Sequence, residues 1–150
     1  MEKGQKLSNF VGTLLELILL IAIVNLITLG FELIAEGRFG VDIPGPEPIW
    51  IGTLNRSVIY SGILIMLYTS ATPKNKDTSF ALVTIVIVEL IESSNLFFLE
   101  ILPRIQWEKT GDFLTFLGGL ALLSVLVLIV AFHSQIHKLF VFEKDEEEEI

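Results

Sequence analysis

The sequence predicts an all-α integral membrane protein, a four-transmembrane-helix bundle. Apolar residues make up 52% of the 150 residues and charged residues only 19%, with a mean hydropathy of +0.69. A soluble domain carries about a quarter charged residues. The apolar residues gather in long runs that lack the period-two alternation of membrane strands. Because a bilayer offers no water to free backbone groups, these runs are expected to form helices.

Four segments supply the predicted spans. A helix that crosses a hydrocarbon core of ~30 Å needs ~20 predominantly apolar residues. The predicted spans cover about residues 10–34, 50–71, 80–102 and 113–132. The last is free of charged residues, whereas the second is short, with an uncharged core of only 57–71 that 49–54 can extend. A re-entrant or tilted element is the alternative for this second segment.

The two ends of the chain differ in character. Lys3 and Lys6 precede the first run, which is much longer than the ~7–15 apolar residues of a signal peptide, so we interpret it as a retained signal-anchor. Cleavage near residues 35–37 is the alternative. The last residues, 143–150, form an acidic tail that supplies −5 of the net charge of −8 and is predicted to be solvated. Residues 1–142 are therefore predicted to form a single transmembrane domain, with helix continuing to about Phe142.

The basic residues predict the orientation. An even number of spans places both termini on one side, which would hold six of the ten basic residues: Lys3, Lys6, Lys74, Lys76, Lys138 and Lys144. By the positive-inside rule both termini are predicted to be cytoplasmic, in the plasma membrane of a prokaryote. Trp50 and Trp107 fall beside the opposite loops, where indole rings prefer the headgroup level.

Composition also excludes several function classes. The absence of cysteine excludes disulfides, thiol catalysis and cysteine-based metal sites, and the acidic charge argues against a nucleic-acid partner. The common catalytic motifs with nucleophile, nucleotide or zinc-binding signatures are missing. We therefore expect neither catalytic residues nor a cofactor. His133 and His137 have the i, i+4 spacing of a metal pair but no third ligand beside them, so no metal site is predicted.

The third predicted span carries an acidic pair. Glu89 and Glu92 lie three residues apart, hence on one helix face, at depths of ~14 and ~18 Å from the cytoplasmic end. A carboxylate that faces lipid at this depth is costly, so this face is expected to turn into the bundle or into a subunit contact. Burial and mutual repulsion disfavour two charges, so at least one of the pair is expected to be protonated.

The candidate intramembrane polar or ion site groups the polar residues of similar depth: Glu89, Glu92, Asn95, Asn25 and Arg56. One interpretation is interhelical hydrogen bonding, with partners among Asn25, Thr28, Ser61 and Ser124. A second is an ion pair of these acids with Arg56, whose level differs from that of Glu92 by about one turn. A third is a proton or cation site on a conduction path. Four further acids are expected closer to the membrane surfaces, in structural roles: Glu16, Glu32, Glu36 and Glu100.

Small residues predict close helix packing. They recur at every fourth position in the second and fourth spans, as Thr53, Ser57 and Ser61 and as Thr115 and Gly119, the last beside Gly118. This spacing lets helix backbones approach closely. Asp112 is predicted to cap the N-terminus of the last span.

The layout and one motif resemble a known family. The plan of four helices with a long first connection, and the apolar-acidic run Ile85-Val86-Ile87-Val88-Glu89-Leu90-Ile91-Glu92, resemble the phosphate-starvation-inducible E (PsiE) family of small membrane proteins. Glu89 and Glu92 stand in the span where that family has an arginine. The resemblance covers most of the chain and implies a class of protein, not a mechanism, since the family's molecular function is not established.

Two functional hypotheses follow. The first is a structural or accessory subunit without catalysis of its own, which lies in the lipid bilayer and forms a homo-oligomer or packs against a larger membrane protein. The alternative is a homo-oligomeric ion channel, or a subunit of a proton- or cation-coupled transporter, that uses Glu89 and Glu92.

Overall fold

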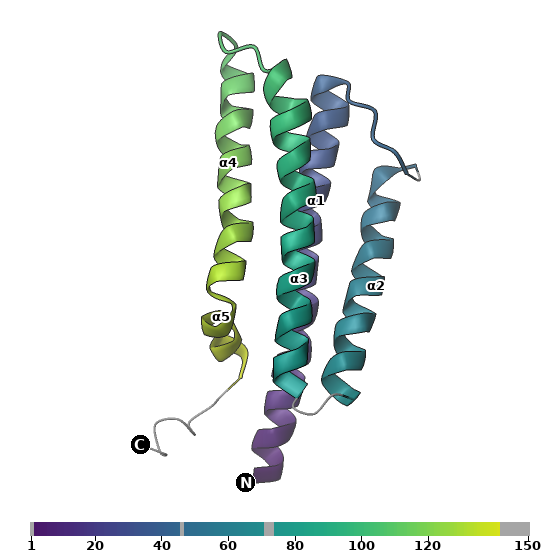
Figure 1. Ribbon diagram of the computed structural model, residues 1–150, viewed down its shortest axis with the longest axis vertical. Helices are drawn as coiled ribbons and strands as arrows, with labels where there is room; N and C mark the ends of the chain where they lie inside the picture. The colour runs from purple at the N-terminus through teal and green to yellow at the C-terminus, as the bar shows by residue number, and fades with distance from the viewer. Residues whose placement is uncertain (1, 46, 71–73, 142–150) are drawn as a thin grey trace.

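The protein is an all-helical bundle, as predicted. The computed structural model describes residues 2–45, 47–70 and 74–141, so the predicted tail at 143–150 lies outside the described residues. Along the chain the elements are α1 (Glu2–Phe39), α2 (Ile49–Ser70), α3 (Lys74–Asn95), the π-helical segment η1 (Leu96–Ile101), the 3-10 turn η2 (Leu102–Arg104), α4 (Thr110–Ala131) and α5 (His133–Phe140) (Figure 1). No strand occurs within these described residues.

Four helical segments are long and apolar enough to cross a membrane. They are Leu7–Phe39, Ile49–Ser70, Asp77–Arg104 and Thr110–Ala131. The prediction of four spans is confirmed, and the second segment has the full length that a crossing needs. The first helix is longer than predicted. It ends only at Gly40, whose positive φ of 71° is a conformation that glycine adopts easily and whose N–H donates to Glu36 O at 3.2 Å.

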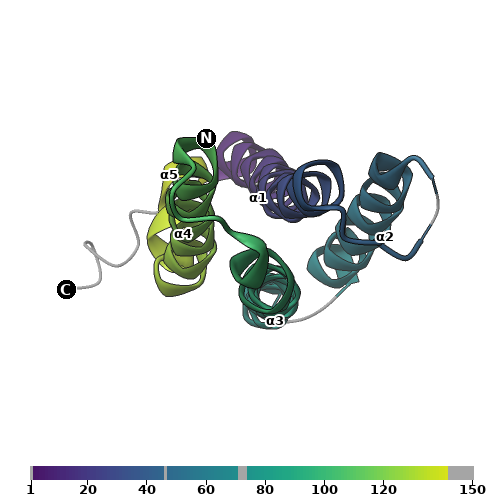
Figure 2. The ribbon, with the colours of Figure 1, turned by 90° about the horizontal axis from the view of Figure 1, so that it is seen from above.

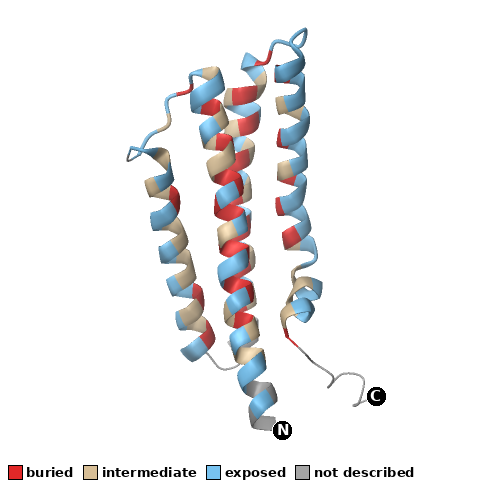
Figure 3. Ribbon diagram, turned by 180° about the vertical axis from the view of Figure 1, so that it is seen from behind, coloured by how far each residue is buried: buried red, intermediate tan, exposed pale blue. Residues whose placement is uncertain are grey.

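Helix α1 lies at the centre of the bundle. It contacts every other helix, with α2 on one side, α4 on the other and α3 packed against it (Figures 1 and 2). Its side chains Ile21 and Val24 are fully buried. Buried residues gather on the inward faces, and the outward faces of the spans are exposed and largely apolar (Figure 3). This is the distribution expected of a bundle whose solvent is lipid.

The third span is not a uniform α-helix. In η1 the hydrogen bonding widens to the π pattern, and Leu102 N–H donates to Phe97 O, five residues back. Pro103 follows at once in η2. Because proline has no N–H and crowds the preceding turn, an ordinary α-helix cannot continue through it. This segment was not predicted, although Pro103 in the sequence was the available signal.

The end of the chain folds back on the first helix. Helix continues after the last span, as predicted, but it is interrupted at Phe132, and α5 ends at Phe140, whereas Phe142 lies outside the described residues. The separate α5 packs against α1, where a Cβ on Gly12 would meet Phe140 O at 2.1 Å. The interruption at Phe132 changes the direction of the chain between α4 and α5.

The bundle has two distinguishable ends. The loop end is the one at which α1 ends and α4 begins, and the terminal end holds the start of α1 together with α5 (Figure 1). Trp50 and Trp107 both lie toward the loop end and both are 53% exposed. The arrangement puts the described parts of both chain ends on one side, as an even number of spans requires.

The orientation can be tested with single cysteines, because the chain has none of its own. If the terminal end is cytoplasmic, Pro44→Cys in the loop after α1 should react with an impermeant maleimide in intact cells, whereas Lys76→Cys should react only after permeabilisation. The permeabilised sample controls for reactivity. Labelling of Lys76→Cys alone in intact cells would show the opposite orientation.

Candidate functional site

Glu89 is the centre of a polar cluster where α1, α2 and α3 meet. Its side chain is fully buried, at 0% exposure. Its Oε1 accepts a hydrogen bond from Thr28 Oγ1 of α1 at 2.9 Å, and its Oε2 accepts one from Tyr60 OH of α2 at 3.2 Å. Each carboxyl oxygen thus has a donor from a different helix, so Glu89 ties three helices together.

A chain of hydroxyls leads to this carboxyl group. Thr28 Oγ1 lies 3.2 Å from Ser93 Oγ, and both residues are buried. A hydroxyl has one proton to donate and can accept others. When Thr28 donates to Glu89, the Ser93 hydroxyl can donate to Thr28, which extends the network by one turn along α3.

Arg56 stands between two carboxyl groups. Its Nε lies 4.0 Å from Glu89 Oε1, and its Nη2 lies 3.6 Å from Glu32 Oε1. Both nitrogens are buried and neither has a hydrogen-bond partner within the described residues. The guanidinium therefore interacts with the two acids through charge and not through close hydrogen bonds.

This arrangement refines two predictions. Of the acidic pair, Glu89 is the member that lies beside Arg56, which also lies 3.6 Å from Glu32. Glu32 was expected near the outer membrane surface, and its side chain is only 16% exposed because it adjoins Arg56. Helix α1 continues to Phe39, which leaves Glu32 about two turns before the helix end.

Glu92 and Asn95 lie outside the buried cluster. Both are exposed, and they line a pocket of about 380 Å³ together with Glu32, Glu100 and residues of the loop after α1. Three residues turn a helix by about 300°, which leaves Glu92 offset by about 60° from Glu89. Only Glu89 of the pair turns into the bundle of a single chain. A subunit contact at Glu92 stays a prediction.

Asn25 is buried but does not reach the acidic pair. Its Nδ2 donates to Ile21 O of its own helix at 3.1 Å, and its Oδ1 has no partner in the described chain. Ser124 is exposed and likewise bonds within its own helix, to Leu120 O at 2.8 Å. Of the predicted partners, Thr28 is the one that the structure brings to Glu89.

Tyr60 was missed by the sequence analysis. It lies one turn beyond Arg56 on α2, so the two share a helix face. That i, i+4 spacing was the available signal. A tyrosine combines an aromatic ring that packs among apolar side chains with a hydroxyl that needs a partner when buried, and Glu89 supplies the partner.

A second polar contact lies at the terminal end. Glu16, which was expected closer to the cytoplasmic surface, is only 3% exposed, and its Oε1 contacts Nδ1 of His137 in α5. The contact joins residues far apart in sequence, which explains why the helix pattern alone could not predict it. His133 contacts Val130 O instead. No group of three His, Cys, Asp or Glu side chains able to hold a metal was found in the described part of the chain.

A third polar contact ties the loop end together. Asp112 was predicted to cap α4, but α4 begins at Thr110 and Asp112 lies in its first turn. Its Oδ1 accepts from Arg38 Nε at 3.0 Å and Nη2 at 2.9 Å, and its Oδ2 accepts from the Gln106 backbone N–H at 2.9 Å. Asp112 thus fastens α1 and the loop before α4 to α4 itself.

Comparisons with protein-family models, with curated proteins and with solved structures found no match for this chain. The resemblance to the PsiE family stays a prediction.

Chemically, the central cluster has more acid than base. Glu32 and Glu89 lie within 4.0 Å of the single guanidinium of Arg56, and Glu92 lines the same pocket as Glu32. One cation cannot balance the two carboxylates beside it, and the exposed Glu92 adds a third acid at the edge of the cluster. The hydroxyls of Thr28 and Tyr60 reduce the cost of burying Glu89, and a proton or a bound cation would supply the remaining compensation.

Proposed function

We propose that the protein is a structural or accessory subunit of a membrane assembly, a small helical bundle without catalysis of its own. The observation that supports this best is the division between interior and exterior. The buried acids Glu89 and Glu16 have partners inside the chain, whereas the outer faces of all four spans expose large apolar side chains. Such faces suit lipid or the helices of another subunit.

The connections give further support. At the loop end the described chain passes from η2 to α4 through residues 105–109 alone. Segments this short leave little room for a soluble site. The surfaces available to a partner are therefore the membrane faces of the helices, and the partner is a second copy of the chain or a larger membrane protein.

Crosslinking in the native membrane tests the proposal. Leu26→Cys on the outer face of α1 is 60% exposed, and Ile21→Cys on its inner face, 0% exposed, is the matched control. With a bismaleimide, we expect Leu26→Cys to give products heavier than the 16.8 kDa chain and Ile21→Cys to give none. Native mass spectrometry should show the same assembly. A monomer in both experiments would contradict the proposal.

A second candidate is an ion-conducting or ion-coupled subunit of a homo-oligomer. The acidic excess around Arg56 favours it, because the pocket lined by Glu92 and Asn95 also reaches Glu32, 3.6 Å from the guanidinium. Under this candidate, reconstituted protein should carry a proton or cation flux that Glu89→Gln and Glu92→Gln abolish. Under the first, the wild-type protein gives no flux, and Glu89→Gln changes thermal stability only.

A further inference from the structure

A basic pocket of about 460 Å³ opens at the loop end of the bundle. Its charged lining consists of Arg38 from α1, Arg104 from η2, and Lys109 and Asp112 at the start of α4, a net charge of +2. Asp112 is already engaged by Arg38 and the Gln106 backbone, and Arg104 lies 3.9 Å from Glu100 in an exposed pair. The three cations outnumber the two acids that pair with them, Asp112 and Glu100, so the pocket keeps an excess of positive charge that favours an anion.

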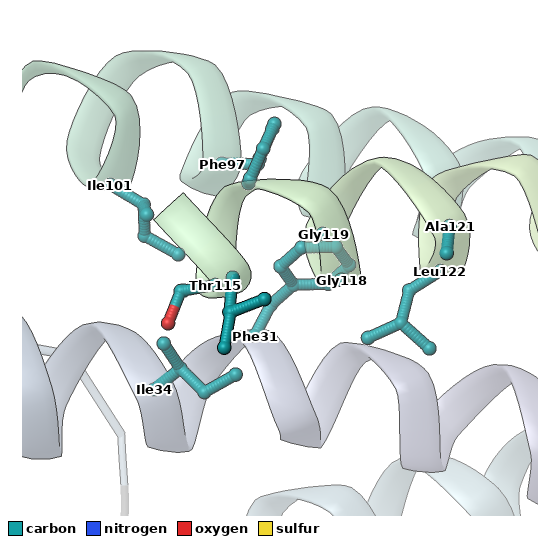
Figure 4. Close-up of a pocket in the computed structure, with 10 residues that line it drawn as sticks. Phe31, Ile34, Phe97, Ile101, Thr115, Gly118, Gly119, Ala121 and Leu122 are labelled. Atoms are coloured by element: carbon teal, nitrogen blue, oxygen red, sulfur yellow. The ribbon is translucent and has the colours of Figure 1, made fainter. Parts of the chain in front are cut away.

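An apolar groove of about 510 Å³ lies along the same helices (Figure 4). Phe31 and Ile34 of α1 form one wall, Phe97 and Ile101 of η1 contribute from α3's side, and α4 forms the opposite wall. The hydroxyl of Thr115 in that wall donates to Gly111 O of its own helix at 2.9 Å. The groove therefore presents almost only apolar surface.

The pocket and the groove are in register. On each element, one residue lines the pocket, and the groove-lining residues lie three or four positions away from it and from one another. This spacing places them on one face of the element. These series are Arg38, Ile34 and Phe31 on α1; Arg104, Ile101 and Phe97 in η2 and η1; and Asp112, Thr115 and Gly119 on α4. From the level of Asp112 to that of Leu122 the groove descends ~15 Å, roughly half of a hydrocarbon core.

We infer that this seam of α1, η1 and α4 binds one phospholipid with an anionic headgroup. Its phosphate lies in the basic pocket, where Lys109 and the guanidinium N–H groups of Arg38 and Arg104 that Asp112 and Glu100 do not engage supply charged donors. One acyl chain lies in the groove beside Gly118. The inference is independent of the proposed function, because a lipid can occupy this seam whatever the bundle does.

Two observations favour this occupant. The basic pocket lies at one end of the seam, and the apolar groove leads away from it. A molecule that fills both has an anionic head and a long apolar tail. Trp107 beside the pocket is half-exposed, with its ring 5.1 Å from that of Phe116, the position expected of an indole at headgroup depth. A free phosphate would leave the groove unused, and an apolar partner helix would cover the pocket without an anion to balance its excess positive charge.

The test is lipid binding to the purified protein in neutral detergent, by native mass spectrometry and by thermal shift. We expect phosphatidylglycerol to bind about tenfold more tightly than phosphatidylcholine, since charge-assisted hydrogen bonds distinguish their net charges. Inorganic phosphate alone should produce no shift. The double variant Arg104→Gln with Lys109→Gln should lose the roughly tenfold preference for phosphatidylglycerol over phosphatidylcholine. Lys138→Gln on α5 is the matched control and should keep it. Arg38 is left intact because it holds Asp112.

The groove has its own variants. A Cβ on Gly118 has no atom within 4 Å, so Gly118→Leu should fill the groove without a clash and weaken the binding of both lipids. Gly62→Leu on α2, equally open, is the control, and Ala121→Leu is a second groove filler. Equal binding of the two lipids, or unchanged phosphatidylglycerol binding by the folded groove variants, would overturn the inference. A shift with inorganic phosphate equal to that with phosphatidylglycerol would show a phosphate site only, and would overturn it too.

Discussion

Gly119→Ala is expected to destabilise the bundle by about 2–3 kcal/mol, a large effect for one methyl group. The added Cβ would lie 2.2 Å from Phe97 Cε1 and under 3.0 Å from two further atoms of that ring. Phe97 is fully buried and packs against the rings of Phe31 and Phe116, with centroids 5.8 Å away in each case. The ring cannot move aside without disturbing its neighbours, so α3 and α4 would have to separate.

The adjacent glycine provides the control. Gly118→Ala adds the same methyl group where no atom lies within 4 Å, and alanine is about 1 kcal/mol more favourable than glycine in a helix interior. The two neighbouring substitutions should therefore have opposite signs in an unfolding titration with a denaturing detergent followed by circular dichroism. Phe97→Leu combined with Gly119→Ala should recover part of the loss. Equal effects at the two glycines would show that α3 and α4 do not meet at Gly119.

These two glycines show what can and cannot be predicted from the sequence alone. The spacing of Thr115 and Gly119 predicts a close approach of helices, and Gly119 does lie against Phe97. The same reasoning cannot separate Gly118 from Gly119, because it does not say which neighbour α4 faces. The spans themselves were predictable within a few residues since the thickness of the bilayer sets their length, and hydropathy marks their position.

The polar cluster was predictable in depth but not in pairing. Counting along the helices placed Glu89 at ~14 Å and Arg56 at ~24 Å from the cytoplasmic end, both within the hydrocarbon core. Which side chains meet, however, depends on helix rotation and lateral packing. The pairing of Glu32 with Arg56 was not predicted, because the sequence of α1 does not say which side chains of α2 lie against it. The contact of Glu16 with His137 was not predicted, because α5 reaches α1 only after the break at Phe132. Both are contacts that no local pattern encodes.

Arg56→Ala is expected to produce the largest loss of stability, about 3–5 kcal/mol, the range for breaking a buried ion pair by removing one partner. Glu89 would keep its hydrogen bonds from Thr28 and Tyr60 but lose the cation 4.0 Å away, and Glu32 would lose the one at 3.6 Å. Arg104→Ala is the matched control. Its pair with Glu100 is an exposed i, i+4 contact, worth about 0.3–0.5 kcal/mol.

The double variants identify the acid that depends most on the guanidinium. Glu89→Gln removes the buried charge while leaving a carbonyl oxygen for one of the two hydroxyl donors, so it should restore part of the stability lost in Arg56→Ala. Glu92→Gln should restore less, because Glu92 is exposed and lies outside the cluster. Unfolding titrations of the wild type, the three single variants and the two double variants form two mutant cycles with Arg56→Ala in common. A larger rescue by Glu92→Gln than by Glu89→Gln would mean that Arg56 compensates Glu92, the pairing that depth alone predicted, and that α2 is rotated relative to α3 in the membrane.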